Sequence, residues 1–315
     1  MTLKGNDHMS VHKIPLSKVG EFGLIDQISR LIKINKSQVI KGIGDDAAVV
    51  KIPRGDKYFL ITTDMLAEGV HFTKAMGAKR IGRKALACSI SDIAAMGGMP
   101  KAAVVSLAVS PRLSVDCVKD LYQGMQTLAG QFQVSIVGGD TIAYKEVIIN
   151  VALLGEVEKK NFVLRSGARK GDRVFVTGFL GRSLQTGKHL SFIPRIEEAR
   201  FLVKNFKPTA MIDISDGLAG DLAHIMDSSR TGAHLYAELI PRAPGASVQD
   251  ALYDGEDFEL LFTLSESNAY RLARLKNLPF RFICIGEIVD KKNGIKLIDR
   301  WGKTSLLKTK SFTHF

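Results

Sequence analysis

The ten residues KGIGDDAAVV, from Lys41 to Val50, decide how the rest of the sequence is interpreted. They place two adjacent carboxylates, Asp45 and Asp46, after flexible glycines and before a run that favours a β-strand. Adjacent carboxylates repel each other, and a fold that holds them near further acids usually does so with a cation. The stretch therefore predicts a metal-binding loop that leads into a strand.

Four other short acidic segments offer the same hard oxygen ligands. They are Thr62-Thr63-Asp64, Ser91-Asp92, Gly138-Gly139-Asp140 and the run from Asp213 to Gly217. Oxygen ligation suits magnesium or calcium, and magnesium typically bridges a few carboxylates to the phosphates of a substrate. We therefore expect the five segments to converge on one site for magnesium and a nucleotide.

Two of these segments also have a plainer interpretation. Thr62 and Thr63 are either ordinary residues of a strand or deliver their hydroxyls to a cleft beside Asp64. Ser215 or Asp216 suits the N-cap of the helix that follows. We favour the site interpretation in both cases: the first strand runs directly into Asp64 at its end, and the second segment accompanies the other acids.

The predicted helix 81–96 places one of the acids on an interior face. Its apolar stripe consists of Ile81, Ala85, Cys88 and Met96. Asp92 falls on the same stripe, four residues from both Cys88 and Met96. A carboxylate that faces the interior needs a metal or a hydrogen-bonding partner, and the alternative is a bond to neighbouring backbone.

The glycines of Gly138-Gly139-Asp140 follow a short predicted strand, 134–137. Gly139 lets the backbone approach a nucleotide phosphate closely, while Asp140 reaches a cation. His71 stands alone in its loop, and a lone histidine is more often structural than functional. The residues by themselves therefore assign it no role.

Two familiar nucleotide-binding loops are excluded by their context. Residues 42–47 fit the pattern G-x-G-x-x-A, but a dinucleotide-binding loop must open a helix, and here a strand and Pro53 follow. Residues 181–189 resemble a P-loop superficially. The glycine spacing is too long, and His189 follows Lys188 where the motif needs Ser or Thr.

Composition points to a globular protein of two domains. The chain has 315 residues, of which 45% are hydrophobic, and this is enough for two cores. Its three cysteines lie far apart, which argues against a disulfide framework or a thiolate metal site and favours the cytoplasm. We see neither a signal peptide nor a stretch of about 20 apolar residues, so no membrane association is expected.

The chain is basic, with a net charge of +12. The lysines and arginines are scattered in ones and twos, without a long basic run or an aromatic stacking motif. We therefore expect a solvated basic surface that attracts anionic nucleotides, and no nucleic-acid partner.

Apolar periodicity predicts strands separated by helices, which is typical of a mixed α/β fold. The expected helices are 21–34, 81–96 and 114–132, and the expected strands are 48–52, 58–63, 102–109, 134–137, 146–157 and 173–177. Rising charge near Lys159 suggests a domain boundary. We predict a flexible N-terminus at 1–20, an N-terminal domain for magnesium and ATP at 21–158, and a C-terminal domain at 159–315.

Seven ordered motifs, from about Gly20 to the C-terminus, resemble the thiamine-monophosphate kinase family, which belongs to the group built like aminoimidazole ribonucleotide synthetase. The motifs are GIGDDAAVV, TTDMLAEGVHF (Thr62–Phe72), SDIAAMGGMP (Ser91–Pro100), VGGDT (Val137–Thr141), RSGARKGD (Arg165–Asp172), DISDGLAGDL (Asp213–Leu222) and GEDFELLF (Gly255–Phe262). Seven motifs in the same order make a chance similarity improbable.

The resemblance implies an α/β fold of the α+β type with two domains. The N-terminal mixed-sheet domain would form a homodimer, and a C-terminal α/β domain would complete the chain. The implied activity is ATP-dependent phosphorylation of thiamine monophosphate to thiamine diphosphate. We expect direct in-line transfer assisted by several magnesium ions, with no protein general base.

The resemblance and the acidic pattern together assign the site. The metal ligands would be Asp46, Thr62, Thr63, Asp64, Asp92, Asp140, Asp213 and Asp216. ATP would contact Gly139, Asp140, Arg165 and Ser215, and the acceptor would contact His71, Glu256 and Phe312. Two departures from the family pattern affect the acceptor pocket: Ser311 replaces a glycine, and Tyr253-Asp254 replaces smaller residues.

Three alternatives are weighed against this assignment. A selenophosphate synthetase would carry a reactive cysteine or selenocysteine near its N-terminus, and residues 1–41 contain no cysteine. A hydrogenase-maturation relative would end in a cysteine, whereas this chain ends in Phe315. A ring-closing synthetase of the same group, or a basic protein that binds nucleic acid without catalysis, stays open.

Overall fold

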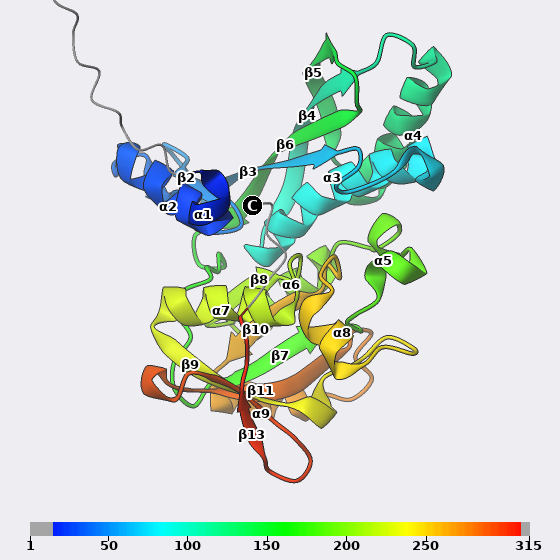
Figure 1. Cartoon of the computed structure of the whole chain (residues 1–315). Helices are drawn as coiled ribbons and strands as arrows, with labels where there is room; N and C mark the ends of the chain where they lie inside the picture. The colour runs from blue at the N-terminus through cyan, green and yellow to red at the C-terminus, as the bar shows by residue number, and fades with distance from the viewer. Residues whose placement is uncertain (1–14, 310–315) are drawn as a thin grey trace, which may run out of the picture. The chain divides into compact units, whose positions relative to one another are not determined.

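The computed structural model describes residues 15–309 (Figure 1). Within this range, residues 35–309 form one compact unit. The short helices α1 (Leu16–Val19) and α2 (Glu21–Leu31) form a separate part. The helix expected at 21–34 is present but ends at Leu31. Most of the N-terminus expected to be flexible lies outside the described residues.

The first sheet has six strands in the order β1-β2-β3-β6-β4-β5. Their bounds are β1 (Val39–Lys41), β2 (Ala48–Lys51), β3 (Lys57–Ala67), β4 (Met99–Val109), β5 (Ser135–Ala143) and β6 (Ile148–Glu158). All neighbours are antiparallel except β4 and β5. This confirms the mixed sheet expected for the N-terminal half.

Helices α3 (Ala78–Ala95) and α4 (Val115–Phe132) cover one face of this sheet, and the turn η1 (Lys74–Met76) precedes α3 (Figure 1). Leu60 and Val105 point toward these helices and are fully buried, whereas Ile61 and Val104 point to the opposite, exposed face. The alternation follows from the two-residue period of a strand.

Close backbone packing fixes α3 against α4. A Cβ atom on Gly82 would come within 1.9 Å of the Leu121 carbonyl oxygen, and one on Gly124 would come within 1.9 Å of the Lys79 carbonyl oxygen. No side chain larger than hydrogen fits at either crossing point.

The second sheet has seven strands in the order β13-β12-β9-β11-β7-β10-β8. Their bounds are β7 (Arg173–Thr177), β8 (Ala210–Asp213), β9 (Thr231–Tyr236), β10 (Leu260–Leu264), β11 (Phe282–Asp290), β12 (Ile295–Ile298) and β13 (Thr304–Leu306). Only β9 and β12 run parallel to each other.

Helices cover both faces of the second sheet. The helices are α5 (Ser183–Thr186), α6 (Ile196–Asn205), α7 (Leu218–Ser229), α8 (Val248–Tyr253) and α9 (Glu266–Ala273), with short turns η2 (Lys188–Leu190), η3 (Ala237–Leu239) and η4 (Lys291–Asn293). One core joins the sheet to α7 and α8, and the other joins it to α3, α6 and α9.

Helix α3 is therefore enclosed by both sheets. The sequence predicts one apolar stripe, but the helix is buried on nearly all sides, because strands of the first sheet lie on one side and α6 and β8 lie on another. The boundary predicted near Lys159 falls between the two sheets. Since one core spans both sheets, the division into two domains stays a prediction.

The observed β5 runs from Ser135 to Ala143, which is longer than the strand predicted at 134–137. Gly138, Gly139 and Asp140 consequently lie inside an edge strand and not in a turn after it. Among residues 15–309, no helix combines the length and hydropathy that crossing a lipid bilayer requires.

Candidate functional site

Four carboxylates from four separate segments meet in the compact unit. Asp46 lies in the loop between β1 and β2, Asp64 on β3, Asp92 on α3 and Asp213 at the end of β8. One carboxylate oxygen from each of Asp46, Asp92 and Asp213 lies within 4.8 Å of the others. We call Asp46, Asp64, Asp92 and Asp213 the carboxylate cluster.

Hydroxyl groups hold three members of the carboxylate cluster in place. Thr62 donates a hydrogen bond to Asp92, Ser89 donates to Asp64 at 2.8 Å, and Ser91 donates to Asp213 at 2.5 Å. These donors orient the carboxylates without neutralising them. Ser89, Ser91 and Asp92 all come from α3, so this one helix supplies much of the site.

The carboxylate cluster has little positive charge of its own. The Arg165 guanidinium binds Asp46 at 2.6 Å, and its backbone N–H donates to Asp45 at 3.1 Å. Lys41 lies 3.3 Å from Asp45. Within residues 15–309, no lysine, arginine or histidine forms an ion pair with Asp64, Asp92 or Asp213.

Burial raises the pKa of the clustered carboxyls. Desolvation is the main cause, and repulsion by neighbouring carboxylates adds to it. The pKa rises to about 6 for Asp64 and to about 7 for Asp213, and that of Asp92 lies well above its usual range. These groups therefore resist ionisation unless a positive charge joins them.

The arrangement fits a hard cation. The Oδ2 atom of Asp46 is buried and has no hydrogen-bond partner among the described residues. Asp64 and Asp92 keep part of their surface exposed, which provides an entry path for an ion. Several carboxylate oxygens with a hydroxyl nearby form the ligand set that magnesium prefers.

A second acidic group lies beside the first. One ligand atom from each of Asp216, Asp221 and His224 lies within 4.8 Å of the others. Asp221 is buried and accepts a hydrogen bond from the Asp216 N–H at 3.2 Å. Desolvation raises the Asp221 pKa well above its usual range, and the charges of Asp216 and Asp213 raise it further.

Helix α7 has Gly217 as its N-cap, without a side-chain capping bond. The alternative role of Ser215 or Asp216 as an N-cap is therefore wrong. The Ser215 carbonyl instead accepts a hydrogen bond from the Glu256 N–H at 2.6 Å, which joins the loop after β8 to the loop before β10.

Two predicted metal ligands are not brought to the carboxylate cluster. The alternation of β3 directs Thr62 and Asp64 toward α3 and exposes Thr63 on the opposite face, where its hydroxyl donates to Asn150 at 3.1 Å. Asp140 lies on the exposed edge strand β5, in register with Ser106, which is itself in register with Asn150. The metal-binding role of Thr63 and Asp140 stays a prediction.

The predicted acceptor residues His71 and Glu256 are joined by a third residue. The Lys84 ammonium donates to the His71 carbonyl at 3.0 Å and forms an ion pair with the Glu256 carboxylate. His71 also accepts a hydrogen bond at Nδ1 from the Ala67 N–H at 3.1 Å. Phe312, the third predicted acceptor residue, lies outside the described residues.

Sequence reasoning did not identify Lys84 or Asp221. A signal existed for Lys84, because it precedes Cys88 and Asp92 at four-residue spacing on a helix otherwise rich in apolar and small residues. Asp221 offered a weaker signal, since an aspartate in the first turn of a helix is common on electrostatic grounds alone.

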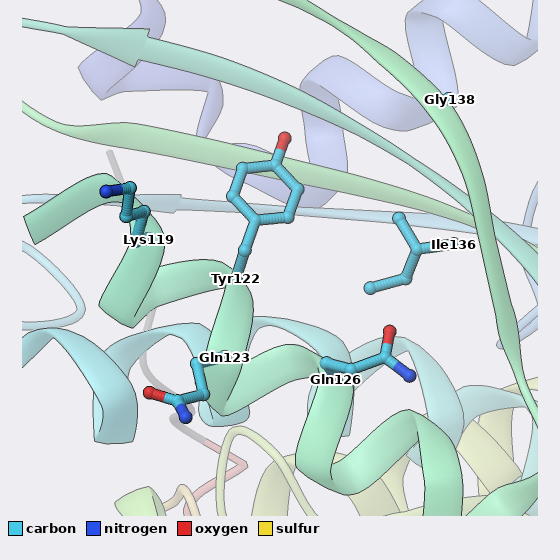
Figure 2. Close-up of a pocket in the computed structure, with 6 residues that line it drawn as sticks. All are labelled: Lys119, Tyr122, Gln123, Gln126, Ile136 and Gly138. Carbon is cyan, nitrogen blue, oxygen red and sulfur yellow. The ribbon is translucent and has the colours of Figure 1, made fainter. Parts of the chain in front are cut away.

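A pocket of about 690 Å³ opens between α4 and the edge strand β5 (Figure 2). It is lined by Lys119, Tyr122, Gln123, Gln126, Ile136 and Gly138. Figure 2 shows the Tyr122 ring extending from α4 toward the strands, with Lys119 on one side and Ile136 on the other. The pocket borders the Gly139-Asp140 segment predicted to contact ATP.

Comparison with known proteins finds one matching family model and relatives that match over most of the chain. The family model described as AIR synthase related protein, N-terminal domain, matches residues 44–157. The thiamine-monophosphate kinase of Buchnera aphidicola subsp. Schizaphis graminum is 33% identical, over 94% of this chain and 98% of its own length. The thiamine-monophosphate kinase of Bacillus subtilis is 34% identical, over 94% of this chain and 99% of its own length.

Solved structures agree with these relatives. A structure described as AaThiL complexed with AMPPCP and TMP is 32% identical, with a TM-score of 0.83, and covers 96% of this chain and 100% of its own. A structure described as the HypE-HypF complex is 20% identical, with a TM-score of 0.71, and covers 90% of this chain and 99% of its own. The second likeness shows a shared fold alone.

The raised pKa values predict how pH affects the metal-free protein. The folded pKa of Asp213, about 7, lies above its ordinary value of 3.8, so the folded state binds more protons between these values. The contribution of this group to stability is full below about pH 4 and is lost as pH rises through about 7. Asp213→Asn should therefore raise the free energy of unfolding at pH 8 in chelator by about 1–3 kcal/mol, and the melting temperature should rise with it.

Calorimetry with and without magnesium measures this effect, and Asp227→Asn, an exposed aspartate on α7, is the matched control. We expect magnesium to stabilise the wild type and the control more than Asp213→Asn. Equal stabilisation of all three proteins, with no gain for Asp213→Asn in chelator, would show that the cluster does not bind the ion.

Proposed function

Because the chain belongs to the thiamine-monophosphate kinase family and is thus an ATP-dependent kinase of thiamine monophosphate, we propose that its carboxylate cluster holds the magnesium for that reaction. The observation that carries the proposal is the buried, unpartnered Oδ2 of Asp46 beside Asp92 and Asp213. Asp64 and the Thr62 hydroxyl complete the proposed ligand set. Asp216, with Asp221 and His224, offers a further position.

Bound magnesium would offset the repulsion between the phosphates of the two substrates. Two unit charges about 4 Å apart repel by roughly 4 kcal/mol at an effective dielectric constant near 20. The chain itself contributes Arg165, whose planar guanidinium matches a phosphate as well as it matches the carboxylate of Asp46. Ser215 lies next to this region in the loop after β8.

The phosphoryl group passes directly from ATP to the acceptor in this proposal. The nearby side chains are poor nucleophiles: burial raises the pKa of the Cys88 thiol well above its usual range, and the aspartates are assigned to metal. The acceptor phosphate is already anionic, so the reaction needs positioning more than it needs a general base.

Rapid mixing of the enzyme with labelled ATP and magnesium, without acceptor, tests the direct path. We expect no stoichiometric burst of ADP and no label on the denatured protein. Addition of thiamine monophosphate should then start steady turnover. A labelled chain that passes its phosphate to the acceptor at the rate of turnover would contradict direct transfer.

We propose that the nucleotide base occupies the pocket between α4 and β5. The Tyr122 ring offers a stacking surface, Lys119 adds positive charge, and Gly138 at the pocket wall has no side chain to fill the space. The pocket volume of about 690 Å³ falls within the range of small-molecule sites.

Tyr122→Ala should raise KM for ATP about tenfold, because stacking of a base on an aromatic ring is worth roughly 1–3 kcal/mol. KM for thiamine monophosphate should change little. Tyr270→Ala on α9, where the tyrosine is 63% exposed, is the matched control. Steady-state kinetics with each substrate varied in turn measure both KM values. An unchanged KM for ATP in Tyr122→Ala would show that the base does not bind in this pocket.

We propose that the exposed face of the first sheet binds a second copy of the chain. Its apolar side chains are too exposed for an ordinary surface: they include Ile61, Met65, Val104, Val137 and Ile142. They come from β3, β4 and β5, so the patch extends across the sheet. The polar residues Thr63 and Asp140 would then lie within the dimer interface.

Met65→Asp should convert the dimer to a monomer, because a carboxylate would be buried within the proposed interface. Val115→Asp, at an exposed position in the first turn of α4, is the control. Light scattering after size-exclusion chromatography measures the mass of both variants. Equal masses for the wild type and Met65→Asp would place the interface elsewhere.

The cytoplasm is the proposed compartment. The three cysteines, Cys88, Cys117 and Cys284, are all free thiols in the described chain, as expected for a reducing environment. ATP, the co-substrate, is available in that compartment.

A further inference from the structure

Lys84 carries a charge at a position with almost no access to water. Its side chain is 1% exposed and is among the largest fully buried side chains of the described residues. A buried ammonium is costly unless its donors are satisfied. The His71 carbonyl and the Glu256 carboxylate are the partners that satisfy Lys84.

The Glu256 carboxylate belongs to a turn with a strained backbone. Glu256 and Phe258 have φ angles of 56° and 50°, which side chains other than glycine rarely adopt. The turn persists because the Glu256 N–H donates to the Ser215 carbonyl and the Phe258 N–H donates to the Ile214 carbonyl, at 2.6 and 2.7 Å. It is therefore fixed to the segment that follows Asp213.

Helix α3 links this turn to the carboxylate cluster. Lys84 and Asp92 are eight residues apart on one face of α3, which corresponds to about 12 Å along the helix axis. Because α3 is enclosed by both sheets, this separation is fixed. One rigid element thus carries the ammonium at one end of the site and a cluster carboxylate at the other.

We propose that Lys84 is a positioning residue of the acceptor site, which holds the His71 loop and the Glu256 turn at a fixed distance from the carboxylate cluster. The proposal rests on the proposed function only in assigning His71 and Glu256 to the acceptor. Stability alone gives little reason for a charge here, because apolar residues often replace a buried ion pair without loss of stability.

Lys84→Met keeps the unbranched shape, is one heavy atom shorter, and removes the charge. We expect KM for thiamine monophosphate to rise about tenfold or more, with KM for ATP changed less than about threefold, because the lost contacts orient the acceptor. Arg200→Met is the matched control. Arg200 is a buried cation that also bridges a carbonyl, that of Gly97, and a carboxylate, that of Glu158, away from the acceptor residues.

A double-mutant cycle with Glu256→Gln separates positioning from general destabilisation. Because Lys84 acts partly through Glu256 and partly through the His71 carbonyl, the double variant should lose less acceptor affinity than the sum of the two single losses. Additive losses, or equal rises in both KM values for Lys84→Met, would overturn the proposal. Lys84→Gln keeps a hydrogen-bond donor without the charge. It should also raise KM for thiamine monophosphate more than KM for ATP, but by a smaller factor, and it replaces the methionine variant in these tests if that variant does not fold.

Hydrogen exchange of the unliganded protein gives a readout that does not depend on catalysis. Lys84→Met should speed exchange in residues 68–72 and 255–258, whereas Arg200→Met should leave these segments unchanged. Unchanged exchange in Lys84→Met would contradict the positioning role. An inactive wild type with the expected exchange pattern would instead count against the proposed function alone.

Discussion

Mutual repulsion among the four carboxylates of the cluster is the constraint on which the rest of the structure depends. The fold brings them together with hydroxyl donors and a single arginine, so desolvation and like charge raise their pKa values. Such an arrangement is unfavourable by itself and becomes favourable when a cation is bound. This local loss of stability is what we expect of the proposed site for phosphates and their metal.

Helix α3 is the element that makes this arrangement possible. It lies against strands of the first sheet and against α6 and β8, and glycines at its crossing with α4 allow close packing. From this fixed position it presents Lys84, Ser89, Ser91 and Asp92 to different parts of the site. The first sheet packs against α3 on one face and exposes apolar residues on the other. The carboxylate cluster and the proposed dimer interface therefore lie on opposite faces of this sheet.

Much of the fold could be predicted from local patterns. The periods of 3.6 and 2 residues located α3, α4, β2 and β7 closely, and the ordered motifs identified the family that the comparisons confirm. The prediction was weaker where tertiary pairing extends an element. The edge strand β5 continues through Gly138-Gly139-Asp140 because it pairs with β4, which the glycines themselves do not indicate.

The sequence by itself determined which residues carry the acids, which helix faces the interior and which family the chain resembles, because these follow from residue type and spacing. Only the tertiary structure decided which acids meet. Asp46 and Arg165 are 119 residues apart and Lys84 and Glu256 are 172 apart, and such pairs leave no trace in a local pattern. Strand alternation likewise separated Thr63 from Thr62 once β3 had a buried face, since neighbouring side chains of a strand point to opposite sides.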